Sequence, residues 1–182
     1  MMRVVIFLLL ALLLGACVGS QTPKLRQARA AKLSAELRAL DPSVGEREAD
    51  LLAATAVVKS SELAREYKPL LVPWLNNNLV NSGYRPRGLC WHWRDDLFPH
   101  LHQLHLQTLD LHLATAKRGS AFEHNAIVVT ARHRPFSEGI VLDPWRGGGA
   151  LSWEKVSVDR YPWEPLAPEL TPDSLRPLFK LR

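Results

Sequence analysis

The sequence predicts an α+β fold, because helical patterns occupy the chain before residue 100 and strand patterns follow it. We expect helices ahead of a cysteine-bearing helix and an antiparallel sheet of roughly three to five strands. A signal segment over residues 1–16 and a tether over residues 17–23 precede the fold. Residues 24–83 are expected to be helical, and residues 84–182 to form the core with a Pro-rich tail. The two parts together suit one compact domain.

The N-terminus has the pattern of a targeting segment. Arg3 is followed by an apolar run from Val4 to Leu14, which is short for a transmembrane helix and suits a cleaved signal. The ending Leu14-Gly15-Ala16-Cys17 resembles the bacterial lipobox, in which the cysteine is lipidated and becomes the new N-terminus. The resemblance implies a lipoprotein of the bacterial cell envelope, held to the membrane through Cys17. Val18 is not the aspartate of an inner-membrane retention signal, so we expect the outer membrane, facing the periplasm. The alternative is an ordinary cleaved signal with an incidental cysteine.

Charge and cysteine content limit the classes of function that the chain can have. The formal net charge is +5, but Lys and Arg are scattered along the chain, which argues against a nucleic-acid partner. The chain has two cysteines, so Cys90 has no disulfide partner if Cys17 is lipidated. An unpaired cysteine in an oxidising envelope indicates a reactive thiol.

Three helices are expected before the cysteine. Residues 24–40 have strong helix propensity, and Pro42 breaks the pattern. Ser43 and Glu46 have the spacing of a capping box for a second helix, which is expected to run from about Glu46 to Tyr67. A third helix is expected to begin at Pro73 and to end at Ser82-Gly83.

The fourth predicted helix carries the candidate nucleophile. Leu89, Trp93 and Leu97 recur every four residues and form one apolar stripe. Gly88 allows a tight entry into this helix, so Cys90 falls in its first turn. Unpaired N–H groups and the helix dipole favour a thiolate at that position. Pro99 is expected to end or kink the helix, with a short helical continuation behind it.

Strands are expected in the second half of the chain. The alternation of apolar and polar residues over 109–114 indicates a half-buried strand. Residues 122–131 and 139–143 are β-branched runs, and residues 151–158 are expected to form a last edge strand. From Tyr161 onward, the proline-rich tail is expected to wrap the surface.

A hairpin between the second and third strands would supply a base and its orienting partner. If the hairpin is centred near residues 133–134, His124 lies opposite Asp143, with Cβ atoms roughly 5 Å apart. A carboxylate at that distance can hold an imidazole in one tautomer. Together with Cys90, the pair completes the set of nucleophile, base and orienting group.

This order of residues resembles the papain-like fold in its transglutaminase-like and bacterial cell-wall-hydrolase forms. The matching segments are Gly88-Leu89-Cys90-Trp91, Glu123-His124-Asn125-Ala126 and Leu142-Asp143-Pro144-Trp145. The resemblance implies a papain-like core with Cys90 as nucleophile, His124 as base and Asp143 as orienting residue. It implies a cysteine hydrolase or acyl transferase for peptide or amide bonds, acting on a peptide, peptidoglycan or protein in the envelope. Papain has a glutamine before its cysteine and this chain does not, so one oxyanion donor besides the Cys90 N–H stays unidentified.

Alternatives accompany each of these residues. Cys90 alone would suit a small buried apolar residue, and the chain would then be a non-catalytic envelope lipoprotein that uses the fold as a binding module. His112 is the rival base, because it lies on the polar face of a strand, and His92 is expected to be structural or a contact at the rim. Trp91 and Trp145 are candidate substrate-binding or rim residues. We expect no cofactor and no metal, because the remaining clustered histidines lack a familiar zinc spacing: His100, His102 and His105.

The lipobox resemblance gives the first test. Cys17→Ser should leave an unprocessed or soluble precursor, because the cysteine sulfur is the atom that accepts the lipid. Membrane fractionation and metabolic lipid labelling measure this directly. Unchanged fractionation and unchanged lipid incorporation in the variant would rule out an anchor at Cys17.

Overall fold

The computed structural model describes residues 21–70 and 72–179, so the predicted signal and Cys17 lie outside the described residues. Within these ranges the chain forms helices and strands with the following bounds: α2 Pro23–Arg38, α3 Glu46–Tyr67, α4 Pro73–Asn81, α5 Cys90–His102, β1 Leu109–Ala116, β2 His124–Ala131, the 3-10 turn η1 Phe136–Glu138, β3 Ile140–Asp143, β4 Ser152–Lys155, β5 Trp163–Pro165, the 3-10 turn η2 Pro168–Leu170 and α6 Arg176–Phe179. No helix in the described part of the chain has the length and apolar character that crossing a membrane needs.

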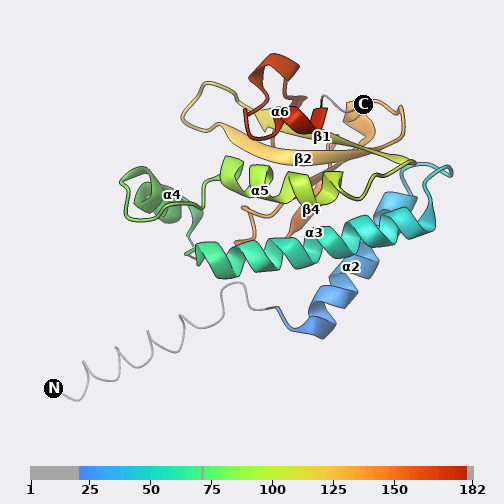
Figure 1. Cartoon of the computed structure of the whole chain (residues 1–182), viewed down its shortest axis with the longest axis horizontal. Coiled ribbons are helices and arrows are strands. Elements are labelled where there is room, and N and C mark those ends of the chain that lie inside the picture. The colour runs from blue at the N-terminus through green and yellow to red at the C-terminus, as the bar shows by residue number, and fades with distance from the viewer. Residues whose placement is uncertain (1–20, 71, 180–182) are drawn as a thin grey trace.

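The predicted α+β class is confirmed. In the described residues, five strands form one antiparallel sheet in the order β4-β3-β2-β1-β5. Helix α5 lies between this sheet and α3, and α2 packs on α3 (Figure 1). The helix that carries Cys90 is therefore covered on both sides.

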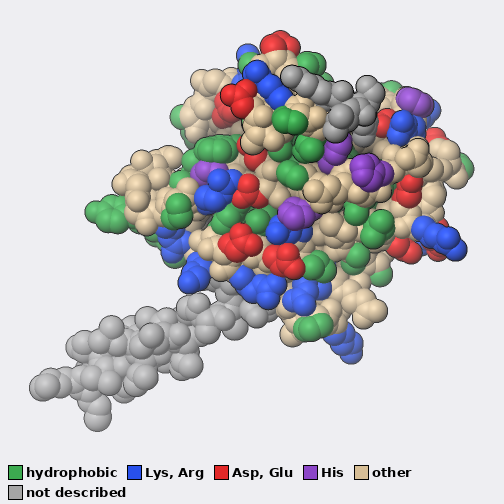
Figure 2. Space-filling view, viewed as in Figure 1, with side chains coloured by type: hydrophobic (Ala, Val, Ile, Leu, Met, Phe, Trp, Pro, Cys, Tyr) green, Lys and Arg blue, Asp and Glu red, His purple; other side chains and the backbone are tan. Residues whose placement is uncertain are grey.

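The main core lies between the sheet and the helices. It takes Leu97 from α5, Leu52 from α3, and Ile127 and Val129 from β2, all fully buried. A smaller cluster, with Val128, Val141 and Trp163, occupies the opposite face of the sheet. Because both faces of β2 are covered, all eight of its residues are buried. On the face shown in Figure 2, basic and acidic side chains are intermixed.

The predictions about two helix ends have different outcomes, and only the predicted cap of α3 is wrong. Ser43 does not cap α3, because its N–H binds the carboxylate of Asp41 at 2.9 Å, and Gly45 is the N-cap instead. Of the two effects expected at Pro99, it does not end α5: the helix runs on to His102 with the proline inside it, so the expected short continuation is present. A proline removes one N–H from the helix interior, and the buried Leu97 and Leu101 on either side keep this helix packed on the core.

The tail contributes a strand that the sequence analysis does not anticipate. Trp163–Pro165 pairs with the end of β1 and forms the edge strand on that side of the sheet. A three-residue strand has too few residues for a period of two to be recognised, and Pro165 suits an edge position because it has no N–H to donate.

Two adjacent leucines of α3 test this packing. Leu52 is fully buried, whereas Leu51 is 49% exposed. Leu52→Ala should lower the free energy of unfolding by about 2–5 kcal/mol, because it leaves a cavity in the core. Leu51→Ala should change it by about 0.5 kcal/mol or less. Urea unfolding of the two variants measures the difference, and equal losses would mean that α3 presents a different face to the core.

Candidate functional site

The position of Cys90 is set by the turn into α5. Cys90 is the first residue of the helix, and Leu89 precedes it as an extended N-cap. Gly88 has a φ of +132°, and a Cβ there would lie 2.6 Å from the side-chain nitrogen of Asn76. Glycine is therefore required at this position, as the sequence indicated.

His92 holds the same turn from within the helix. Its Nδ1 accepts the N–H groups of Gly88 and Leu89, each at 3.1 Å. Burial, followed by the charge of Arg87, lowers the pKa of His92 to about 4, so the ring stays neutral and keeps accepting these bonds. The first helical bond runs from the Trp93 N–H to the Leu89 carbonyl, so the N–H groups before it favour negative charge at the start of α5. His92 is thus structural, one of the two roles expected for it.

The sulfur of Cys90 is a free thiol with restricted access. Its residue is 8% exposed and lines a cavity of about 380 Å³ together with His124. The sulfur lies 4.0 Å from the carbonyl oxygen of Glu123 and 3.9 Å from the side-chain nitrogen of Asn125. Polar groups therefore surround the thiol.

His124 joins the sulfur to a buried carboxylate. Its Nε2 lies 2.6 Å from Oδ2 of Asp143, and both side chains are almost fully buried. Burial opposes the charged imidazole, but hydrogen bonds to Asp143 and Cys90 raise the pKa of His124 to about 9. Since Nε2 binds Asp143, Nδ1 is the nitrogen that remains for Cys90. The structure thus brings the three sequence-predicted residues together.

The predicted register of the hairpin is wrong by two residues. Ile127 pairs with Leu142, so continuing the ladder places Asp143 opposite Ala126 and not opposite His124. A shift by two residues keeps Asp143 and His124 on the same face of the sheet, because side chains alternate with a period of two. His124 therefore contacts Asp143 diagonally across the ladder, and not as its directly opposite neighbour.

Arg146 is a site residue that the sequence analysis misses. Its Nε lies 3.1 Å from Oδ2 of Asp143, and its backbone N–H donates to Oδ1 at 3.0 Å. Its guanidinium also pairs with the buried Asp159 at 2.9 Å. From the sequence, the glycine run after Arg146 indicates only a turn. In the structure this turn brings the Arg146 side chain back to the carboxylate of Asp143, three residues earlier.

Aromatic rings enclose the imidazole. The ring centres of Trp145, Tyr161 and Trp163 lie 4.8, 4.7 and 5.3 Å from that of His124. Trp145 thus lies at the cavity, and its indole N–H donates to Asn77 of α4 at 3.2 Å. These rings shield the His124–Asp143 pair from water, which strengthens the interaction.

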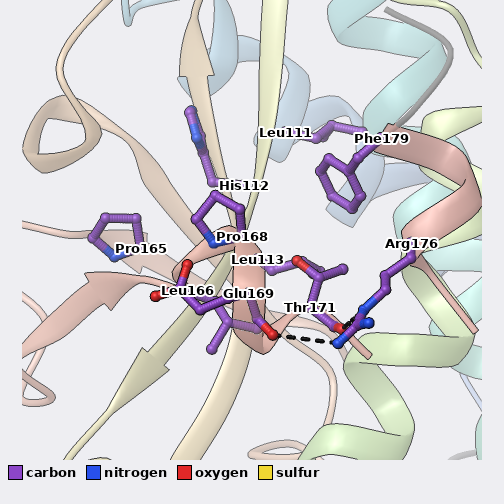
Figure 3. Close-up of a pocket in the computed structure, with 10 residues that line it drawn as sticks. All are labelled: Leu111, His112, Leu113, Pro165, Leu166, Pro168, Glu169, Thr171, Arg176 and Phe179. Atoms are coloured by element: carbon purple, nitrogen blue, oxygen red, sulfur yellow. Dashed lines mark hydrogen bonds between the residues drawn. The ribbon is translucent and has the colours of Figure 1, made fainter. Parts of the chain in front are cut away.

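Two other predicted candidates lie elsewhere. Trp91 is 42% exposed and does not line the cavity of Cys90; it borders two other depressions, one of which Arg94 and Asn125 also line. His112 binds Thr130 at 3.0 Å and lines a larger cavity of about 640 Å³ at the edge of β1. Figure 3 shows this second cavity, where Phe179 lies near Leu111 and the guanidinium of Arg176 binds the backbone carbonyls of Thr171 and Glu169. His112 is therefore not grouped with Cys90.

Comparisons with protein-family models, curated proteins and solved structures found no match to this chain. The class is therefore defined by geometry alone. The described part of the chain is an α+β protein in which a cysteine at a helix N-terminus and a histidine line one cavity, and a buried aspartate binds the histidine.

The histidine–aspartate pair predicts a pH dependence. Because the pKa of His124 is raised from 6.5 to about 9, its stabilising contribution is complete below pH 6.5 and is lost as the pH rises through about 9. In Asp143→Asn, the pKa of His124 should fall by at least about one pH unit, since burial is then less opposed. NMR titration of the ring protons measures this, with His92 as an internal control. An unchanged His124 titration would contradict the role of Asp143.

Proposed function

We propose that this chain is a cysteine hydrolase or acyl transferase that acts on peptide or amide bonds. The observation that supports the proposal is the contact of His124 with Asp143 on one side and with Cys90 on the other, at a shared cavity. The helix N-terminus favours the thiolate, and the raised pKa of His124 favours its charged partner. Each of these conditions raises the reactivity of a cysteine.

The proposed reaction has two halves. The thiolate attacks the substrate carbonyl carbon, a C–S bond forms, and the carbonyl π electrons move to oxygen. When this intermediate collapses, the C–N bond breaks and the leaving amine takes the proton of His124. Water then loses a proton to His124 and attacks the thioester. A C–O bond forms and the C–S bond breaks, which releases the acid and regenerates the thiolate beside protonated His124. In a transfer reaction, an amine replaces this water.

The fold is compatible with the proposed papain-like core. Helix α5, with the cysteine at its start, packs against an antiparallel sheet whose neighbouring strands supply His124 and Asp143. Helices α2 to α4 are then additions to that core. Under the same proposal, Cys17 carries the lipid anchor in the bacterial envelope, and the substrate is a peptide, peptidoglycan or protein there.

One observation favours a second candidate function. Cys90 is only 8% exposed, as expected for an inert thiol in a binding module. Such a module would use the aromatic cavity beside His124 without forming a covalent intermediate. The two functions differ in the reactivity of the thiol.

Alkylation by iodoacetamide at pH 6 separates the two functions. Cys90 of the full chain should react faster than glutathione, because His124 and the helix start favour the thiolate. His124→Ala should slow the reaction at least about tenfold, and Asp143→Asn should slow it less. Mass spectrometry of the peptide with Cys90 measures the rate, and Cys90→Ser gives the background. A rate no greater than that of glutathione would favour the binding module.

A further inference from the structure

We propose that the side-chain amide of Asn125 is the second donor of the oxyanion hole, and that the buried guanidinium of Arg94 fixes its orientation. This inference rests on the proposed function, since an oxyanion forms only if Cys90 attacks a carbonyl. The backbone N–H of Cys90 is the first donor.

Asn125 lies close to the sulfur on the side away from His124. The two residues are neighbours on β2, so their side chains leave opposite faces of the strand. The side-chain nitrogen of Asn125 lies 3.9 Å from the sulfur. An oxyanion donor must lie about 3 Å from the substrate oxygen, and that oxygen is attached one carbon away from the sulfur. With the nitrogen 3.9 Å from the sulfur, that oxygen can lie within reach of the nitrogen if it sits to one side of the line that joins the two atoms.

The orientation of the amide follows from its partners. Oδ1 of Asn125 accepts a hydrogen bond from Arg94 at 2.5 Å, so the nitrogen must face the sulfur. One hydrogen of that nitrogen is directed to the Glu123 carboxylate at 3.2 Å, which leaves the other for the sulfur. The amide is 7% exposed, so water does not readily replace these partners.

Arg94 is well placed to act through Asn125. It follows Cys90 by four residues on α5 and therefore lies on the same face of the helix. Its Nε binds Asp95 at 2.7 Å while another nitrogen binds Asn125, and the residue is 4% exposed. A buried cation with two fixed partners holds the amide in one orientation, so Arg94 is a positioning residue.

Two reactions of the same thiol test the proposal. Acylation by p-nitrophenyl acetate passes through an oxyanion, whereas alkylation by iodoacetamide does not. The readout is the ratio of the two rate constants, because the thiolate fraction affects both equally. Asn125→Ala should lower this ratio by roughly 10²- to 10³-fold. Asn125→Asp keeps an acceptor for Arg94 but has no amide donor, and should lower the ratio similarly if the alanine variant fails to fold.

Controls separate the outcomes. Thr130→Ala removes another buried polar side chain of β2, distant from the sulfur, and should leave the ratio unchanged. Arg94→Lys keeps the charge but lacks the forked geometry, so it should lower the ratio in the native chain and have no further effect on Asn125→Ala.

The failures are distinguishable. A native chain that neither reagent modifies at Cys90 would refute the proposed function itself. A native chain that is acylated, with an unchanged ratio in the Asn125 variants, would refute only the role of Asn125. Equal losses in both reactions would place the effect on the thiolate and would also overturn the oxyanion assignment.

Discussion

The geometry of the site depends on the hydrogen bonds of one residue, Gly88. Its carbonyl accepts the side chain of Asn76 at 3.1 Å and the indole N–H of Trp93 at 3.2 Å, while its own N–H binds His92. These bonds join α4 to the start of α5. Trp93 is in turn buried against Tyr67 of α3, with ring centres 4.7 Å apart. The cysteine follows two residues after Gly88, so its position is determined by packing that extends to the helical layer.

Buried charge is concentrated around this cysteine. Arg94 and Asp95 form one buried pair, and Asp143 and Asp159 share Arg146 as a partner. Removing charges from water costs several kcal/mol per ion, and well-packed apolar residues often stabilise a fold equally well. Both networks reach residues that lie next to the thiol: Arg94 binds Asn125, and Arg146 binds the Asp143 that holds His124.

Strong local patterns made much of the fold predictable. Helices α3 and α4 begin at the predicted residues. The pairing of a strand histidine with a later aspartate follows from the order of the strands. What the sequence could not supply depends on long-range contacts. The register of β2 and β3 shifted because η1 extends the connection beyond the assumed turn. Arg94 and Arg146 look like ordinary surface cations until the fold buries one and returns the other to Asp143.

Side chains alternate between the two faces of a β-strand, and this explains how two adjacent residues can both lie near one sulfur without sharing partners. His124 and Asn125 begin β2 and leave opposite faces, one toward Asp143 and the other toward Arg94 of α5. A slip of β2 by one residue would exchange these faces and separate the imidazole from its carboxylate. The strand resists that slip because Ile127 and Val129 fill the helical core while Ala126 fits the smaller cluster behind it. Core packing along the whole strand thus determines which of the two residues faces Asp143 and which faces Arg94.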